Sequence, residues 1–189
     1  DTEPRRSRMT SGGSVAGDER LRLFLALQLP ERWLDAIVAW QARAFAGARV
    51  RVVPREHLHM TLVFLGSRPA RELPAIVGRL REAAAAAAEI RLQPDRYRET
   101  RGAAMLTFED VGGAGGALAD AAGRDEDRPW LPHVTVGRYR DRPRLQQEFP
   151  ATLRTHVLVP SDAAAFLSKL RPSGADYEVL ASADLGGSE

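Results

Sequence analysis

Two short stretches of this chain each place a histidine two residues before a threonine. His59 and Thr61 lie in HLHMTLVFLG, and His133 and Thr135 lie in PHVTVGRYR. Alternate side chains of a β-strand share a face, so each histidine would lie beside its threonine while the apolar residues face a core. If both polar faces line one groove, two imidazoles and two hydroxyls meet a single ligand. Such a set suits acid–base chemistry on a phosphate, because imidazole exchanges protons near neutral pH.

The residues before and within the first motif predict a strand, a helix and two more strands. RLRLFLALQL alternates and then runs apolar up to Pro30, which predicts a buried strand. Helical spacing follows over 31–46, and Gly47 can provide a left-handed stop. A strand is expected near 49–53, and the first histidine strand over 57–65, ended by Gly66. The stripe of the helix consists of Leu34, Ile37, Val38, Gln41 and Phe45.

The rest of the chain predicts a second set of elements of the same kind. In order these are a helix over 73–88, strands over 90–98 and 103–110, a Gly-rich loop with at most a short helix over 112–130, the second histidine strand over 132–139, and closing strands over 155–160 and 177–185 around a turn at Pro172-Ser173-Gly174. One histidine strand then falls in each half. The order indicates a duplicated α+β unit.

Composition limits the classes to which this protein can belong. Its 189 residues fit a single bilobal domain over 20–185, preceded by a polar, Gly/Ser-rich stretch over 1–19 that we expect to be a flexible leader. The chain has no cysteine, which excludes disulfides, thiolate metal sites and a cysteine nucleophile. No apolar stretch approaches the length of a membrane span, and no signal peptide is evident. We therefore expect a cytoplasmic protein that does not bind membranes.

The basic residues are almost all arginine. Lys169 is the only lysine among 27 basic side chains, while the net charge is only +2. Arginine suits phosphate because its planar fork donates paired hydrogen bonds and keeps its charge. A GC-rich genome would produce the same bias, so arginine content alone is weak support for nucleic-acid binding.

Beyond the two tetrapeptides, the motifs resemble the two-histidine (2H) phosphoesterase superfamily. The resemblance is to its bacterial LigT-like branch, the RNA 2′,3′-cyclic phosphodiesterases that are also called 2′-5′ RNA ligases. The segments RLFLALQLP, VPREHLHMTLVFLG, DRPWLPHVTVGR and YEVL occur in the order of that family. Together they extend the resemblance over about residues 20 to 185.

The resemblance implies an α+β, bilobal fold in which two antiparallel sheets line a central cleft with the helices outside. It implies that His59 is the proton donor and His133 the proton acceptor, although the residues themselves do not fix that direction. Thr61, Thr135 and Arg138 would bind the phosphate of the substrate. No metal or other cofactor is implied, and a monomer is expected.

The implied reaction is hydrolysis of RNA 2′,3′-cyclic phosphate ends to 2′-phosphomonoesters. The reverse reaction would join RNA ends through a 2′-5′ bond. The partners would be RNAs with 2′,3′-cyclic phosphate or 2′-phosphate ends, among them tRNA fragments. Two alternatives remain open: a phosphodiesterase for a small cyclic phosphate or a 2′-5′ oligonucleotide, and a noncatalytic RNA-binding module.

Other features have simpler interpretations. His57 with His59 has the spacing of a metal-binding pair, but no further ligands follow, so a residue at the start of the strand is favoured. His156 is expected to be structural within its strand. The glycine run 112–116 lacks the Gly-Lys-Ser/Thr ending of a phosphate loop, which favours a flexible loop. Residues expected in the core are Trp33, Trp40, Phe24 and Phe64.

Two arginine-rich segments interleave tyrosine with arginine. They are DRYRETR over 95–101 and GRYRDRPR over 137–144. This pattern suits stacking on single-stranded RNA. Solvated strand ends explain it nearly as well.

Overall fold

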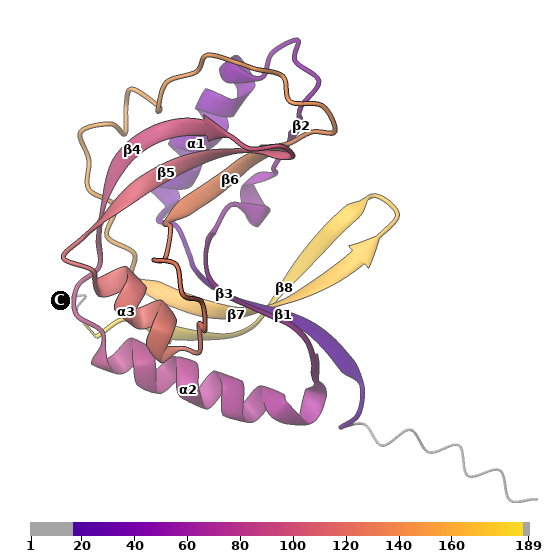
Figure 1. Ribbon diagram of the computed structural model, residues 1–189, viewed down its shortest axis with the longest axis vertical. Helices are drawn as coiled ribbons and strands as arrows, with labels where there is room; N and C mark the ends of the chain where they lie inside the picture. Colours follow the sequence, from indigo (N-terminus) through magenta and orange to yellow (C-terminus); the bar gives the residue numbers. More distant parts are fainter. Residues whose placement is uncertain (1–16, 187–189) are drawn as a thin grey trace, which may run out of the picture.

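The computed structural model describes residues 17–186 as an α+β fold with two four-stranded antiparallel sheets (Figure 1). The sheet orders are β3-β1-β7-β8 and β2-β6-β5-β4, which confirms the expected fold class. The strands are β1 (Arg20–Leu27), β2 (Arg51–Val52), β3 (Met60–Pro69), β4 (Arg91–Glu99), β5 (Ala103–Val111), β6 (His133–Arg138), β7 (Asp162–Arg171) and β8 (Gly174–Asp184). The α-helices are α1 (Glu31–Ala44), α2 (Leu73–Ala86) and α3 (Ala114–Ala121), with short 3₁₀ turns at Arg55–His57 and Ala70–Glu72.

Each sheet combines strands from both halves of the chain. The lower sheet in Figure 1 joins β1 and β3 to β7 and β8, and the upper sheet joins β2 to β4, β5 and β6. Helix α2 packs against β7 and β8 below the lower sheet, while α1 packs against the upper sheet through Trp33 on Phe108 and Trp40 on Tyr97. The two histidine motifs therefore lie in different sheets.

The central strand β1 is buried on both faces, as its apolar run predicts. Leu23, Leu25 and Leu27 are at most 2% exposed and point away from the face that carries Phe24. Phe24 belongs to a second, smaller apolar cluster with Ala26, Ala164 and Phe166 and with Tyr177 beside it. Because this cluster lies on the face of the sheet opposite to the main core, it forms an apolar floor that faces the other sheet.

Helix α1 positions the edge of the upper sheet through a buried glutamine. Gln41 is 2% exposed, and its amide donates hydrogen bonds to the carbonyls of Val53 and Val136 at 3.0 and 2.8 Å. These bonds satisfy a buried polar group and tie the helix to the strand that carries the second motif. Gly47 has φ of 72° just after the helix, the conformation expected for its stop.

The structure corrects two predicted strands. Residues 155–160 form no strand, and Leu158 makes only an isolated bridge with Leu92. Strand β1 instead pairs with β7, a strand that was not predicted. Its sequence begins DAAAFL, and periodicity does not indicate a strand there because alanine favours helix. The first histidine strand also begins later and runs further than 57–65, since β3 passes through Gly66 with φ of 68° and an irregular register against β1.

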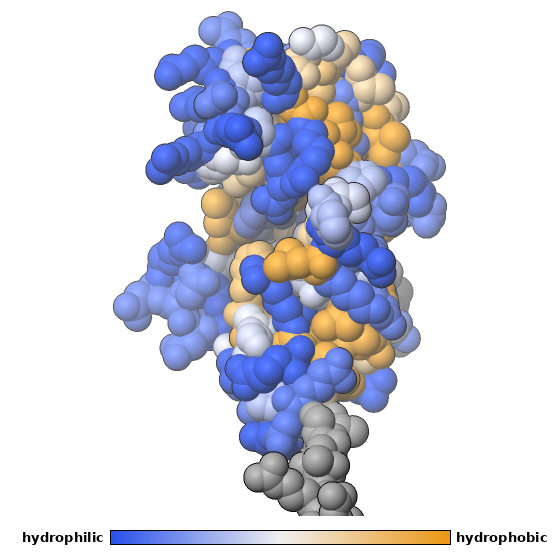
Figure 2. Space-filling view, turned by 90° about the vertical axis from the view of Figure 1, so that its right-hand side faces the viewer, coloured by the Kyte–Doolittle hydropathy of each residue, from blue (hydrophilic) through white to orange (hydrophobic). Residues whose placement is uncertain are grey.

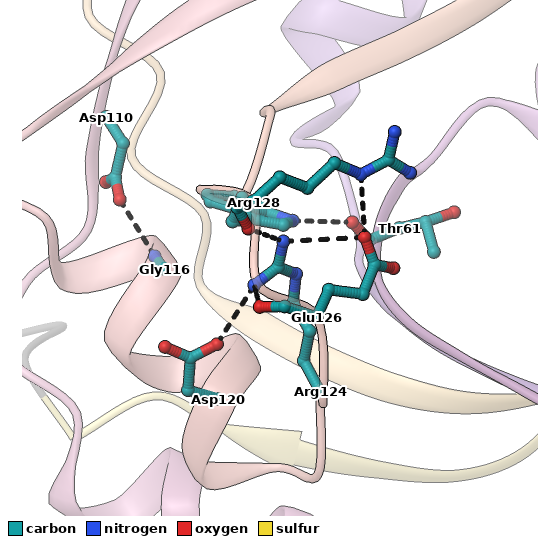
Figure 3. Close-up of polar contacts among 8 residues, drawn as sticks. Thr61, Asp110, Gly116, Asp120, Arg124, Glu126 and Arg128 are labelled. Atoms are coloured by element: carbon teal, nitrogen blue, oxygen red, sulfur yellow. Dashed lines mark hydrogen bonds and ion pairs between the residues drawn. The ribbon is translucent and has the colours of Figure 1, made fainter.

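The Gly-rich segment contains one short helix, the most that was expected there. The interpretation of 112–116 as a flexible loop is wrong for its second part, because α3 begins at Ala114 and glycines of this run have structural roles. The Asp110 carboxylate accepts hydrogen bonds from the N–H groups of Gly115 and Gly116 at 3.0 and 2.8 Å. Figure 3 shows the bond from Gly116. Asp110 therefore occupies the donors that a phosphate loop would offer to a ligand. A Cβ at Gly115 would lie 2.4 Å from the Trp130 ring, so glycine there lets the indole pack on the helix.

The predicted leader 1–19 lies mostly outside the described residues, of which β1 is the first strand. Within 17–186 no helix combines the length and apolar character needed to cross a bilayer. Hydrophilic residues cover most of the face in Figure 2, with apolar residues showing between them.

Candidate active site

His59 lies immediately before β3 and its ring is oriented by the backbone. Its Nδ1 is 2.7 Å from the carbonyl oxygen of His57. A carbonyl only accepts, so Nδ1 carries a proton and Nε2 is the nitrogen available for proton exchange. Nε2 lies 3.0 Å from Oγ1 of Thr61. In the neutral imidazole, the hydroxyl of Thr61 donates this hydrogen bond.

His133 is the first residue of β6 and is held in the same way. Its Nδ1 is 2.9 Å from the carbonyl oxygen of Leu131, again the residue two positions earlier. The alternation predicted for both motifs is present, since the histidines and threonines are partly exposed while their apolar neighbours are at most 2% exposed. These buried neighbours are Met60, Leu62, Val134 and Val136.

A cavity of about 350 Å³ between the two sheets brings the predicted site residues together. We call it the histidine cavity. His59, Thr61, His133, Thr135 and Arg138 all line it. Its other lining residues, which come mainly from β1, β7 and β8, were not predicted as site residues: Arg22, Phe24, Phe64, Ser168, Leu170, Ala175 and Tyr177. Two of them, Phe24 and Phe64, were expected in the core. Tyr177 lies in the YEVL segment and Arg22 begins RLFLALQLP. The segments that resemble the family were therefore the sequence signal that could have identified these two residues as lining the cavity.

The apolar floor shields His59 from water. The ring of Phe24 lies 4.9 Å from the His59 ring, with Tyr177 edge-on at 5.6 Å and Phe166 at 6.0 Å. Burial lowers the pKa of His59 to about 4, against the opposing effect of its bond to the His57 carbonyl. Electrostatic repulsion from the neighbouring basic residues His133, Arg138 and His57 lowers it further. His59 is therefore neutral near neutral pH while the cavity holds no anion.

Neither His57 nor His156 lies in a strand, although His57 was expected at the start of one and His156 within one. His57 ends the 3₁₀ turn before His59, with its ring 4.6 Å from that of Tyr177 and its Nε2 3.9 Å from Asp176. His156 is in no strand and pairs with Arg32 at 2.6 Å, outside the histidine cavity. Among residues 17–186 no group of three or more His, Asp or Glu side chains is arranged to hold a metal ion.

The segment that leads into His133 is fixed by contacts that sequence reasoning missed. The indole of Trp130 donates a hydrogen bond to the carbonyl of Thr61 at 3.0 Å, which ties the segment before His133 to the first histidine motif. Arg124, whose side chain is 7% exposed, pairs with Asp120 at 3.2 Å and Glu126 at 3.6 Å (Figure 3). These contacts hold the segment between α3 and β6 in position.

Several aromatic residues differ from their predicted roles. Phe64 is 75% exposed and lines the histidine cavity, so its assignment to the core was wrong, whereas Phe24 is buried in the small cluster. Tyr97 donates to Glu99 at 2.8 Å, and the Tyr139 hydroxyl lies 2.7 Å from the carbonyls of Thr100 and Ala103. The hydroxyls of both tyrosines are used within the protein, which favours a structural role.

Comparisons with known proteins show which family this chain is similar to. The family LigT like Phosphoesterase matches residues 27–98. A curated RNA 2′,3′-cyclic phosphodiesterase of Thermus thermophilus is 31% identical over 185 residues, which cover 88% of this chain and 91% of that protein. A protein of the same name from Escherichia coli is 37% identical over 67 residues, 34% of this chain and 38% of that protein.

Solved structures have the same fold. A crystal structure of a Thermus thermophilus protein has a TM-score of 0.72 and 29% identity, covering 89% of this chain and all of that one. Escherichia coli LigT complexed with ATP has a TM-score of 0.74 at 24% identity, over 88% of this chain and 98% of that one, and supports the fold alone. On the sequence match to the full-length Thermus relative, the chain belongs to the LigT-like phosphoesterase family and is an enzyme of that class.

Proposed function

We propose that this enzyme hydrolyses the 2′,3′-cyclic phosphate at the end of an RNA to a 2′-phosphomonoester, without a metal ion. The observation that carries the proposal is that His59 and His133, from different sheets, line one cavity together with Thr61, Thr135 and Arg138. The name of the Thermus relative supports the same substrate.

The reaction needs one group that removes a proton and one that supplies it. His133 takes a proton from water as the water oxygen bonds to phosphorus. The bond from phosphorus to the 3′ oxygen then breaks, and His59 protonates that oxygen. Each role typically contributes ~10² to 10⁴ in rate. No oxidant or further reactant is required.

The low pKa of His59 bears on this assignment. A neutral His59 has no proton on Nε2 to donate, so it has to gain one when the substrate binds. The negative charge of a bound phosphate beside the imidazole favours this protonation, because an opposite charge in a shielded site raises a histidine pKa. Once protonated, an imidazolium of low pKa is a strong acid toward the leaving oxygen.

Threonine hydroxyls and a guanidinium complete the site. Thr61 and Thr135 lie beside their histidines, and Arg138 ends β6 at the same cavity. Preplaced donors stabilise the charge that grows on the nonbridging phosphate oxygens. With the 5′-hydroxyl of a second RNA in place of water, the same ring opening would form a 2′-5′ bond, since the 3′ oxygen leaves and the phosphoryl group stays on the 2′ oxygen. The substrates would be RNA ends such as those of tRNA fragments. A monomer would suffice, since one chain provides both histidines.

A direct test uses an RNA oligonucleotide that ends in a 2′,3′-cyclic phosphate, incubated with the enzyme in the presence of EDTA. The product should gain the mass of one water and become sensitive to phosphatase, with the phosphoryl group on the 2′ oxygen. A product with the phosphoryl group on the 3′ oxygen would mean that the 2′ oxygen, and not the 3′ oxygen, is the leaving group. Loss of turnover in EDTA, or an unchanged oligonucleotide, would contradict the proposal.

A further inference from the structure

A second hollow opens beside the histidine cavity. It has a volume of about 140 Å³ and shares His59, Arg138, Ala175 and Tyr177 with the larger cavity. The residues that belong to this hollow alone include Arg51, His57, Ser173 and Gly174. We call it the Arg51 hollow. Because the two hollows share lining residues, a ligand bound at the two histidines can extend into this second hollow while it stays in contact with the protein.

Two like charges stand directly opposite each other at this hollow. In the antiparallel pairing of β2 with β6, Arg51 is the partner of Arg138, so both side chains share one face of the sheet. Like charges in such a pair destabilise a sheet. Within residues 17–186, none of the ion pairs involves either arginine. An anion between them would relieve the repulsion.

Arg51 also reaches the other sheet. Its Nη1 lies 3.3 Å from the point that a Cβ on Gly174 would occupy, and Gly174 begins β8 with φ of 124°. The guanidinium thus lies against the β7–β8 turn, which contributes Ser173 to the hollow. Asp176 lies 3.9 Å from His57 of this hollow and is paired with Arg171 at 3.2 Å. It forms no ion pair with Arg51 or Arg138 among residues 17–186.

The chemistry of an RNA end identifies an anion that could fill the hollow. Beyond the cyclic phosphate, the chain continues only through the 5′ oxygen of the same ribose, which carries the next phosphate. We propose that the Arg51 hollow binds this second phosphate, so that the enzyme favours an RNA end over a free nucleoside 2′,3′-cyclic phosphate. The inference rests on the proposed function, because it assumes a cyclic phosphate at the two histidines.

The test compares adenosine 2′,3′-cyclic phosphate with the same compound carrying a 5′-phosphate. The wild-type enzyme should show a higher kcat/KM for the 5′-phosphorylated compound. In Arg51→Gln the ratio of the two kcat/KM values should fall about tenfold, the loss expected for one hydrogen bond to a charged group. The matched control is Arg49→Gln, an exposed arginine outside both cavities, for which the ratio should stay within about twofold of wild type.

A second readout follows binding alone. Calorimetry should give tighter binding of adenosine 2′,5′-bisphosphate than of adenosine 2′-phosphate, with the difference reduced in Arg51→Gln. Equal ratios for wild type and Arg51→Gln, or equal losses in both variants, would overturn the subsite. Failure of wild type to hydrolyse either cyclic phosphate or the oligonucleotide would instead overturn the proposed function, and the inference with it.

Discussion

The two histidine motifs have the same backbone arrangement in different surroundings. In each, Nδ1 is bonded to the carbonyl two residues earlier, which leaves Nε2 for chemistry. His59, however, lies on the floor formed by Phe24, Phe166 and Tyr177. His133 begins a strand of the other sheet, beside a hollow whose lining includes the charged residues Arg124, Glu126 and Arg128.

The repeated motif therefore fixes the orientation of each imidazole ring, whereas residues of the neighbouring strands set the proton affinity of His59. The pKa of His59 falls to about 4 mainly because aromatic rings replace water around it, and these rings come from β1, β7 and β8 rather than from the motif. In the proposed reaction, this contrast would let two similar motifs perform opposite proton transfers.

Removing either imidazole should have the largest effect. His59→Ala and His133→Ala should each lower kcat/KM on a cyclic-phosphate RNA end by ~10² to 10⁴. A substrate with sulfur at the 3′ position separates the two roles, because a thiol of pKa near 8.5 leaves without help from an acid. The sulfur substrate should restore most of the activity of His59→Ala and little of that of His133→Ala. Rescue of the opposite variant would exchange the two roles.

The low pKa of His59 should appear in the pH dependence of stability. An unfolded chain protonates this histidine near pH 6.5, whereas the folded protein resists until about pH 4, so acidification through this window destabilises the fold. Part of the ring faces the cavity, so we expect a loss of about 2 kcal/mol. The free energy of unfolding, measured with urea, should fall between pH 7 and pH 4.5 in both proteins. The fall should be about 2 kcal/mol smaller in His59→Gln than in the wild type. Equal losses in the two proteins would contradict the shift.

Opening the floor should bring the His59 pKa closer to its ordinary value. Phe24→Leu removes the ring 4.9 Å from the imidazole while keeping an apolar side chain in the cluster. We expect the His59 pKa to rise by about one unit, equivalent to about 1.4 kcal/mol. Proton NMR titration of the imidazole signals measures this. Trp33→Leu, in the main core, provides the control, and an equal shift there would show that burial by the floor is not the cause.

The hydrogen bond between the two halves should have the smallest effect. Trp130→Phe removes the donor to the Thr61 carbonyl and keeps a ring against Gly115. The free energy of unfolding should fall by about 1 kcal/mol. Because this bond ties the segment before His133 to the first motif, KM for the RNA end should rise more than kcat falls. An unchanged KM would mean that the two halves are positioned independently.

Much of the fold could be predicted from local pattern. The stripe of α1 and the apolar run of β1 report directly on burial, and both elements are where periodicity places them. Strand β7 was missed because its alanines suit a helix in isolation, and only packing against β1 makes small side chains favourable there. Phe64 was misplaced because hydrophobicity does not reveal that a strand edge lines a cavity.

In the candidate site too, some features could be predicted from local sequence pattern and others could not. The motifs predicted which side chains would meet, since His59 and His133 follow from alternation and resemblance. Their environment could not be predicted, because the rings over His59 and the Trp130 bond depend on residues distant in the chain. Asp110 shows the limit most clearly. Nothing in the glycine run itself reveals that an upstream carboxylate occupies its N–H groups.

The interleaving of strands between the sheets has a consequence for biosynthesis. As the protein leaves the ribosome, β1 and β3 emerge early, but the neighbour of β1 on its other side is β7, which is translated after every strand of the upper sheet. Neither sheet can close as an independent folding unit in the first half of translation. Such nonlocal pairing slows folding. A nascent chain would therefore expose an apolar strand edge until translation is nearly finished, which makes it a candidate for chaperone capture.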